Sequence, residues 1–217
     1  MDALLASPMI LKEVVTDGHL EIAALMKRES KYKEVVHQND VWHGAKNITK
    51  KVNAAAKAKG NDQLLLWVPS IRNHFWHCAK TCDNNSKNFK DKWIGILHHV
   101  VNEHEWVIEE GINGGKCGHD PLGDEARTKP WLKKESTAHK ALAKIVLDVR
   151  FLNTLIYYVN FRHTGFLESY HNVILMYAAK RQAYSNPVYK ARNLLAAIDF
   201  NCHRGRAFAT TADGEPK

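Results

Sequence analysis

The feature that most constrains the fold is a change in the spacing of apolar residues at Asp40. Before Asp40, two short runs rich in β-forming residues, 10–16 and 34–38, flank a segment, 19–27, in which apolar residues have helical spacing. Two strands joined by a helix favour a parallel βαβ unit, because parallel strands need a crossover connection. After Asp40 the apolar residues recur mainly three or four positions apart. This spacing predicts that the rest of the chain is mostly helical.

Glycine, asparagine and proline separate the predicted helices. The first helix follows Asp40, and its apolar stripe is Val41, Ala45, Ile48, Val52 and Ala55. We expect Pro69 to begin the second helix, because proline fits the first helical turn, where its missing N–H is not needed. Further helical stripes cover 89–104, 142–156, 167–180 and 188–199, whereas the glycine-rich stretch 111–129 predicts a linker or an ordered loop.

The composition narrows the class of protein. The 217 residues include 31 Lys and Arg against 23 Asp and Glu, and the resulting net charge of +8 suits a polyanion partner such as DNA. At 45% hydrophobic residues the chain is too apolar to be disordered. The longest apolar runs, such as 64–68, are far shorter than the ~18 residues of a membrane span. The sequence therefore predicts no membrane span, and it predicts no secretory signal because the first ten residues lack a basic stretch. Its four cysteines fit a reducing compartment.

Three short constellations of acidic residues and histidine stand where predicted elements meet. Asp17 follows the first strand, at the edge where α/β folds bind ligands, although aspartate there also suits a helix N-cap. Asp40 and His43 follow the second strand, and a cap beside a partly buried histidine is the simpler interpretation. Glu168 and His171 share one face of a predicted helix, where a carboxylate also suits the first turn.

These three constellations, in this order, carry a resemblance to a known family. The segments are Val14–His19, Asp40–Asn47 and His163–His171. The chain resembles the catalytic region of metazoan cut-and-paste DNA transposases of the DDE type, most closely the Kolobok-like group and its domesticated relatives. The similarity runs over nearly the whole chain, and the blocks 17–46 and 161–192 are its most specific parts.

The resemblance implies a partial RNase H-like α/β core that keeps two parallel strands and carries a large helical insertion. Asp17 and Glu168 would be the second and third of three catalytic carboxylates, which together hold two Mg²⁺ ions for DNA cleavage and strand transfer. Asp40, His43 and His171 would be structural or near-site residues.

The resemblance also implies that part of the catalytic core precedes Met1. The family carries its first catalytic aspartate on the first strand, and Asp2 is a poor substitute because it falls in a predicted helix. We therefore expect an N-terminally truncated, transposase-derived nuclear protein that is inactive by itself. The open edge of the 10–16 strand would pair with the missing segment or with another copy of the chain. The implied division is 1–43 for the core, 44–150 for the insertion, 151–203 for the helices that return the glutamate, and 204–217 for a flexible tail.

The cysteines predict a separate metal site. Cys78 and Cys82 lie four residues apart on one helical face, and Cys117 and His119 lie in the glycine-rich loop. Thiolate and imidazole are the ligands that tetrahedral zinc prefers, so these four residues form a candidate structural zinc site. Buried cysteines without a metal are the alternative. On the zinc interpretation, replacing both Cys78 and Cys82 by alanine abolishes zinc binding. His74 and His104 are reserve ligands for this site. His98 and His99 are interpreted as ordinary helical or surface residues.

A cluster of lysines follows His43. Lys46, Lys50 and Lys51 are expected to contact DNA phosphates without reading the base sequence, and a solvated lysine-rich helix face is the alternative. Two other functions stay open beside the transposase-derived one. The first alternative is a domesticated, non-catalytic DNA-binding protein. The second is a zinc-stapled helical module for protein interactions.

Overall fold

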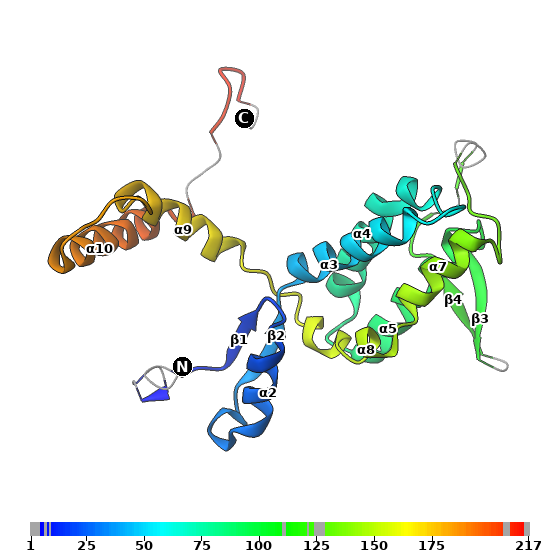
Figure 1. Cartoon of the computed structure of the whole chain (residues 1–217), viewed down its shortest axis with the longest axis horizontal. Helices are drawn as coiled ribbons and strands as arrows, with labels where there is room; N and C mark the ends of the chain where they lie inside the picture. The colour runs from blue at the N-terminus through cyan, green and yellow to red at the C-terminus, as the bar shows by residue number, and fades with distance from the viewer. Residues whose placement is uncertain are drawn as a thin grey trace. The chain divides into compact units, whose positions relative to one another are not determined.

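The computed structural model of the chain describes residues 5, 6, 8, 10–109, 112–120, 122–123, 129–205 and 209–214. The chain divides into two compact units, Met1–His163 and Thr164–Lys217. Figure 1 labels the helices and strands of both units, and we describe each unit by itself. The finer boundaries expected after residues 43, 150 and 203 stay predictions.

The first unit begins with the predicted parallel βαβ arrangement. Strand β1 (Glu13–Thr16) leads through helix α2 (Leu20–Arg28) and the 3₁₀ turn η1 (Ser30–Tyr32) to strand β2 (Val36–Asn39). The two strands pair in parallel, from Glu13 opposite Val36 to Thr16 opposite Asn39. A small core of three buried side chains supports the pair: Met26, Tyr32 and Val35. The prediction of a parallel βαβ unit is confirmed.

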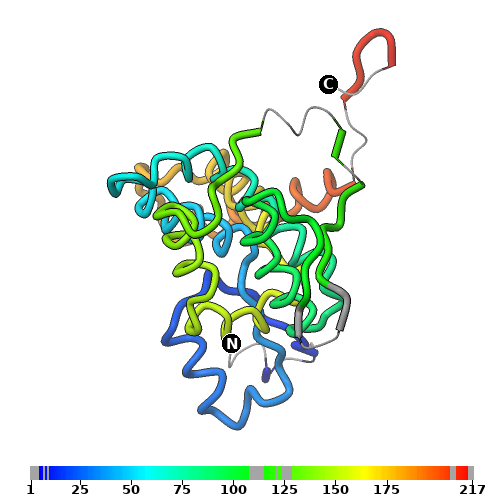
Figure 2. Tube along the Cα trace, turned by 90° about the vertical axis from the view of Figure 1, so that its right-hand side faces the viewer, coloured from blue at the N-terminus to red at the C-terminus, as the bar shows by residue number. Residues whose placement is uncertain are grey.

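The rest of the first unit is mostly helical. Its helices are α3 (Val41–Ala56), α4 (Leu64–Thr81), α5 (Ser86–Ile94), α6 (Ile96–His99), α7 (Thr137–Val146), α8 (Val149–Leu152) and the 3₁₀ turn η3 (Leu155–Tyr158). Helix α3 packs against α4 and α7; Figure 1 shows α3 and α4 side by side, and Figure 2 follows the same part of the chain from another side. The largest fully buried side chains of this core are Trp93, Phe75 and Phe89.

Helix α4 begins five residues before Pro69, so the expectation that Pro69 starts the helix is wrong. Leu64 and Ile71, on either side of the proline, are both fully buried. The apolar stripe therefore continues past Pro69, which is exposed and leaves one hydrogen bond of the helix unmade.

The glycine-rich stretch contains a strand that the sequence analysis missed. Strands β3 (Glu105–Glu109) and β4 (Ile112–Lys116) form an antiparallel hairpin in which Trp106 faces Gly115. A Cβ atom on Gly115 would lie 2.1 Å from the indole Nε1 of Trp106. Glycine is thus required here because the indole packs directly against the backbone of β4, which is a reason for glycine that differs from loop formation.

The helical stripe predicted over 142–156 is broken into α7, α8 and η3. Asp148 ends the run, because its Oδ1 accepts a hydrogen bond of 3.0 Å from the Arg150 N–H and so caps a new helix at Val149.

The second unit is a pair of helices, α9 (Gly165–Tyr177) and α10 (Asn186–His203), which pack against each other. Both helices were predicted. Among its described residues, only Ala178 and Ala196 are buried. In the part of the chain that the structure describes, none of the helices has the length and apolar character needed to cross a bilayer.

Candidate metal centre

Four side chains of the first unit converge beside the β3–β4 hairpin. They are His99, His104, Cys117 and His119, and one ligand atom from each lies within 4.8 Å of the other three. His99 is the last residue of α6, His104 directly precedes β3, and Cys117 directly follows β4. His119 is exposed, whereas the other three are partly buried. This cluster could hold a metal ion such as zinc.

The turn after α6 and the hairpin register bring these residues together. Asn102, with a φ of 63°, reverses the chain after α6. The hairpin pairing then extends beyond β4, because the Cys117 N–H donates a 2.9 Å hydrogen bond to the His104 carbonyl. Next to the cluster, the ring of His98 stacks on Trp106 with its centroid 4.7 Å away. The end of α6 and the start of β3 are therefore held together by packing.

Three distances within the cluster match tetrahedral coordination. Cys117 Sγ lies 3.3 Å from His99 Nδ1 and 3.4 Å from His104 Nδ1. His119 Nε2 lies 3.4 Å from His99 Nδ1. A tetrahedral zinc ion with bonds of about 2.0–2.3 Å separates its ligand atoms by roughly 3.3–3.6 Å. These three distances therefore agree with four ligands around one ion.

The outward nitrogens of two histidines have their own partners. His104 Nε2 lies 3.0 Å from Asn102 Oδ1, and His119 Nδ1 lies 2.7 Å from the Asp120 carbonyl oxygen. Since an oxygen of either kind accepts a hydrogen bond, the outward nitrogen carries the proton and the inward nitrogen keeps its lone pair. His104 Nδ1 and His119 Nε2 are thus set up as metal ligands.

The surroundings favour the neutral imidazole of His99 and of His104. Burial, followed by the neighbouring His104 and His119, lowers the pKa of His99 to about 4. Burial and then His119 also lower the pKa of His104, and burial raises the pKa of the Cys117 thiol. Neutral imidazole is the form that binds a metal, and the ion would displace the thiol proton.

Only half of the predicted zinc ligands belong to this cluster. Cys117 and His119 are members, whereas Cys78 and Cys82 are not. Both thiols are fully buried in the helical core, and the Cys82 thiol donates to the carbonyl oxygens of Ala79 and Val159. The assignment of Cys78 and Cys82 to the zinc site is therefore corrected, because their shared helical face is the apolar face that α4 buries.

Two histidines complete the cluster instead. His104 is the reserve ligand expected from the sequence, and His99, which the sequence indicates as an ordinary helical or surface residue, lies in the cluster as well. A signal for both was present in the sequence, since a histidine pair five residues apart precedes the Cys117-Gly118-His119 triplet. The hairpin that joins pair and triplet was the missing information. His74 lies instead beside Cys78, with its Nε2 donating 2.9 Å to the Lys92 carbonyl oxygen.

The two acidic residues that follow the parallel strands differ in burial and in hydrogen bonding. Asp17 is exposed in the turn after β1. The N-cap of α2 is His19, which makes no side-chain cap bond, so the expectation that Asp17 caps this helix is wrong. Asp40 is buried, and its Oδ1 accepts hydrogen bonds from the N–H groups of Trp42 (2.6 Å) and His43 (3.1 Å). The capping interpretation of Asp40 is confirmed, and His43 is partly buried beside it.

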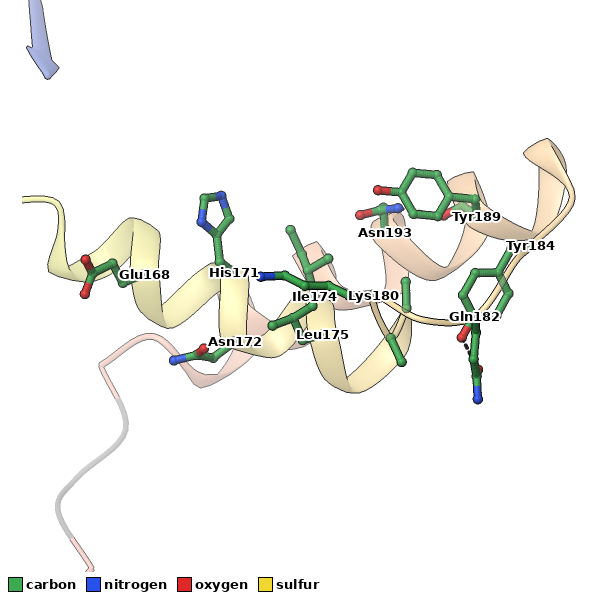
Figure 3. Close-up of a pocket in the computed structure, with 12 residues that line it drawn as sticks. Glu168, His171, Asn172, Ile174, Leu175, Lys180, Gln182, Tyr184, Tyr189 and Asn193 are labelled. Carbon is green, nitrogen blue, oxygen red and sulfur yellow. Dashed lines mark hydrogen bonds between the residues drawn. The ribbon is translucent and has the colours of Figure 1, made fainter. Parts of the chain in front are cut away.

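Glu168 lies in the second unit, in the first turn of α9, as the helix-start interpretation expects. It lines a pocket of about 720 Å³ together with His171 and with Asn193 of α10. Figure 3 shows Glu168 and His171 on successive turns of α9. Because Asp17 belongs to the first unit and Glu168 to the second, their joint binding of Mg²⁺ stays a prediction.

The three predicted DNA-binding lysines are all exposed on α3. The Lys46 ammonium lies 4.7 Å from the centre of the Trp42 ring. The Lys51 ammonium forms an ion pair of 3.2 Å with Asp148 and holds the pKa of that carboxyl below its usual value. Lys51 is therefore engaged within the molecule, whereas Lys50 is exposed to solvent.

Comparisons of the chain with protein-family models, with curated proteins and with solved structures found no match.

Proposed function

We propose that this protein binds one structural zinc ion through His99, His104, Cys117 and His119. The convergence of the four ligand atoms within 4.8 Å carries the proposal. A catalytic zinc keeps a coordination position open for water, whereas a structural zinc is closed by four protein ligands. Four ligands are present here, so the ion serves the fold.

The zinc ion would tie the hairpin to the helical core. A two-stranded hairpin is only marginally stable alone, and β3 pairs with β4 alone among the described strands. His99 belongs to α6, while Cys117 and His119 follow β4. An ion shared by these residues fixes the open end of the hairpin, where β3 begins and β4 ends, to α6. The protein is in this respect the zinc-stapled helical module of the sequence analysis.

Zinc content tests this proposal. Protein purified without chelator is expected to hold about one zinc per chain. The variant His104→Ala with Cys117→Ser should hold almost none. Cys202→Ser, which changes an exposed thiol of the second unit, is the matched control and should keep its zinc. Wild-type protein without zinc would contradict the proposal, as would equal zinc in both variants.

A second candidate function is that of a transposase-derived, DNA-binding protein. The observation that favours it is the parallel pairing of β1 and β2, after which Asp17 and Asp40 follow at the same sheet edge. This is the placement that an RNase H-like core requires at its second catalytic aspartate. On this proposal the chain is a nuclear protein, Asp17 and Glu168 are the ancestral Mg²⁺ ligands, and Lys46 and Lys50 contact DNA.

DNA binding and nicking assays test the second candidate. The chain is expected to bind duplex DNA with a steep salt dependence, and Lys46→Gln with Lys50→Gln should weaken that binding. Asp17→Ala should leave the binding unchanged. No nicking is expected from the chain alone with Mg²⁺. The absence of salt-dependent DNA binding would contradict this candidate without affecting the zinc proposal.

A further inference from the structure

A cavity of the first unit lies where α2 and η1 meet the start of β2 and η3. Its volume is about 510 Å³, which is within the range of small-ligand sites. Its wall includes four charged side chains between the last turn of α2 and the residue after η1, together with two aromatic side chains. They are Lys27, Arg28, Glu29 and Lys33, with His37 and Tyr157.

The cavity carries a net positive charge. Three of its side chains are cations and one is a carboxylate, and 3 − 1 = +2. The carboxylate of Glu29 is already engaged, because Arg28 forms an ion pair with it at 3.1 Å. Within the described part of the chain, Lys27 and Lys33 form no ion pair with a carboxylate. Two lysines of the cavity wall thus lack a carboxylate partner among the described residues.

Tyr157 holds the ammonium group of Lys27. The Nζ atom of Lys27 lies 5.6 Å from the centre of the Tyr157 ring. A hydrogen bond with Tyr157 is the main cause that raises the pKa of Lys27, so the ammonium form is favoured. The ring of His37 lies beside Tyr157, with the centroids 5.5 Å apart. Its Nε2 is 2.9 Å from Thr16 Oγ1, so the histidine belongs to the wall and is held in place.

We propose that this cavity binds a phosphate group through Lys27 and Lys33, with Tyr157 as a neighbouring wall. An ammonium group binds phosphate as a point charge with three N–H donors. The two lysines approach from successive elements, Lys27 from α2 and Lys33 from the end of η1. The site shares no residue with the zinc cluster or with the α3 lysines. Where the phosphate belongs to DNA, the site deepens the proposed DNA binding; where it belongs to a free nucleotide, the site is independent of it.

The test compares two charge-matched double variants of the full chain. Lys27→Gln with Lys33→Gln removes the two cavity cations, and Lys133→Gln with Lys144→Gln removes two exposed lysines elsewhere in the unit. Binding of a fluorescein-labelled DNA duplex is measured by anisotropy at several salt concentrations. Binding of adenosine monophosphate and of inorganic phosphate is measured by calorimetry. Circular dichroism melting shows whether each variant is folded, which is expected because all four lysines are exposed.

Each outcome has a definite meaning. Loss of about tenfold in DNA affinity for the cavity variant, with a salt slope lower by about one, assigns the site to a backbone phosphate. Loss of nucleotide or phosphate binding with unchanged DNA binding assigns it to a free phosphate compound. If the cavity variant and the control variant behave alike with all three probes, the proposal is overturned. DNA binding that disappears only in the Lys46→Gln, Lys50→Gln variant, with phosphate and nucleotide binding unchanged in the cavity variant, likewise overturns the proposal.

Discussion

Two regions of the first unit place cysteine beside histidine, and their surroundings differ. In the first region, Cys78 is fully buried on α4 and touches His74, with a Sγ to Nε2 distance of 3.4 Å. Burial raises the pKa of the Cys78 thiol to about 12. In the second region, Cys117 is only partly buried, and three imidazoles surround its sulfur.

The comparison shows that closeness along the sequence and convergence of ligand atoms are different properties. Cys78 and Cys82 share a helical face, but that face packs into the apolar core. The ligands of the second region come from segments as far apart as His99 and His119, and a hairpin brings them together. Metal binding needs converging lone pairs with room for the ion, and only the second region has them.

The largest expected effect is the removal of zinc. A chelator should lower the melting temperature of the wild-type protein by about 10 °C, because losing a ligand present at about a thousand times its dissociation constant costs about 4 kcal/mol. Melting followed by circular dichroism measures this shift. The His104→Ala, Cys117→Ser variant is the control, since the chelator should no longer change its melting temperature. An equal shift of the melting temperature in both proteins would show that the chelator does not act through this cluster.

The next effect concerns the buried thiols. Cys78→Ala together with Cys82→Ala should cost about 2–3 kcal/mol in the free energy of unfolding, because each change leaves a small cavity in the core. Zinc content should stay at the wild-type value. Urea unfolding and metal analysis measure the two quantities separately. Loss of zinc with little change in stability would reverse the assignment of the two regions.

A smaller effect is expected at the hairpin. Gly115→Ala should cost about 1–3 kcal/mol, because the new methyl group meets the Trp106 indole and forces it aside. Since the hairpin carries Cys117, the variant should also bind zinc more weakly in a competition titration with a chromogenic chelator. Gly123→Ala is the matched control, because a Cβ atom there meets nothing within 4 Å. Equal zinc affinity in the two variants would uncouple the hairpin from the metal centre.

The smallest effect is a pH dependence in the first region. Burial lowers the pKa of His74 to about 4, so the folded protein keeps this imidazole neutral while the unfolded chain protonates it near pH 6.5. Stability is present above pH 6.5 and falls by about 1.4 kcal/mol per pH unit as the pH drops from 6.5 toward 4. The free energy of unfolding of the wild type and of His74→Gln, both treated with chelator, is measured by urea unfolding between pH 6.5 and 5.5. Over this pH range the variant should lose about 1 kcal/mol less stability than the wild type. An identical dependence of stability on pH in the two proteins would contradict the role of His74.

Local patterns in the sequence predicted the parts of the fold that depend on neighbouring residues. The strand–helix–strand run before Asp40 and the Asp40 cap of α3 are of this kind, because spacing and capping act within a few residues. The placement of Glu168 in a first helical turn is another. The β3–β4 hairpin was missed because glycine was interpreted as loop-forming, whereas Gly115 leaves room for a tryptophan on the facing strand.

The sequence by itself determined that the chain has cysteine and histidine suited to zinc, a parallel βαβ start and a mostly helical remainder. Only the tertiary structure decided which side chains meet. Helical spacing placed Cys78 and Cys82 on one face, but core packing buries that face among apolar side chains. The hairpin register, which depends on the fit of Trp106 against Gly115, set Cys117 beside His104 and thereby formed the cluster. Ligand convergence is a property of nonlocal packing, and for that reason residue spacing alone does not predict it.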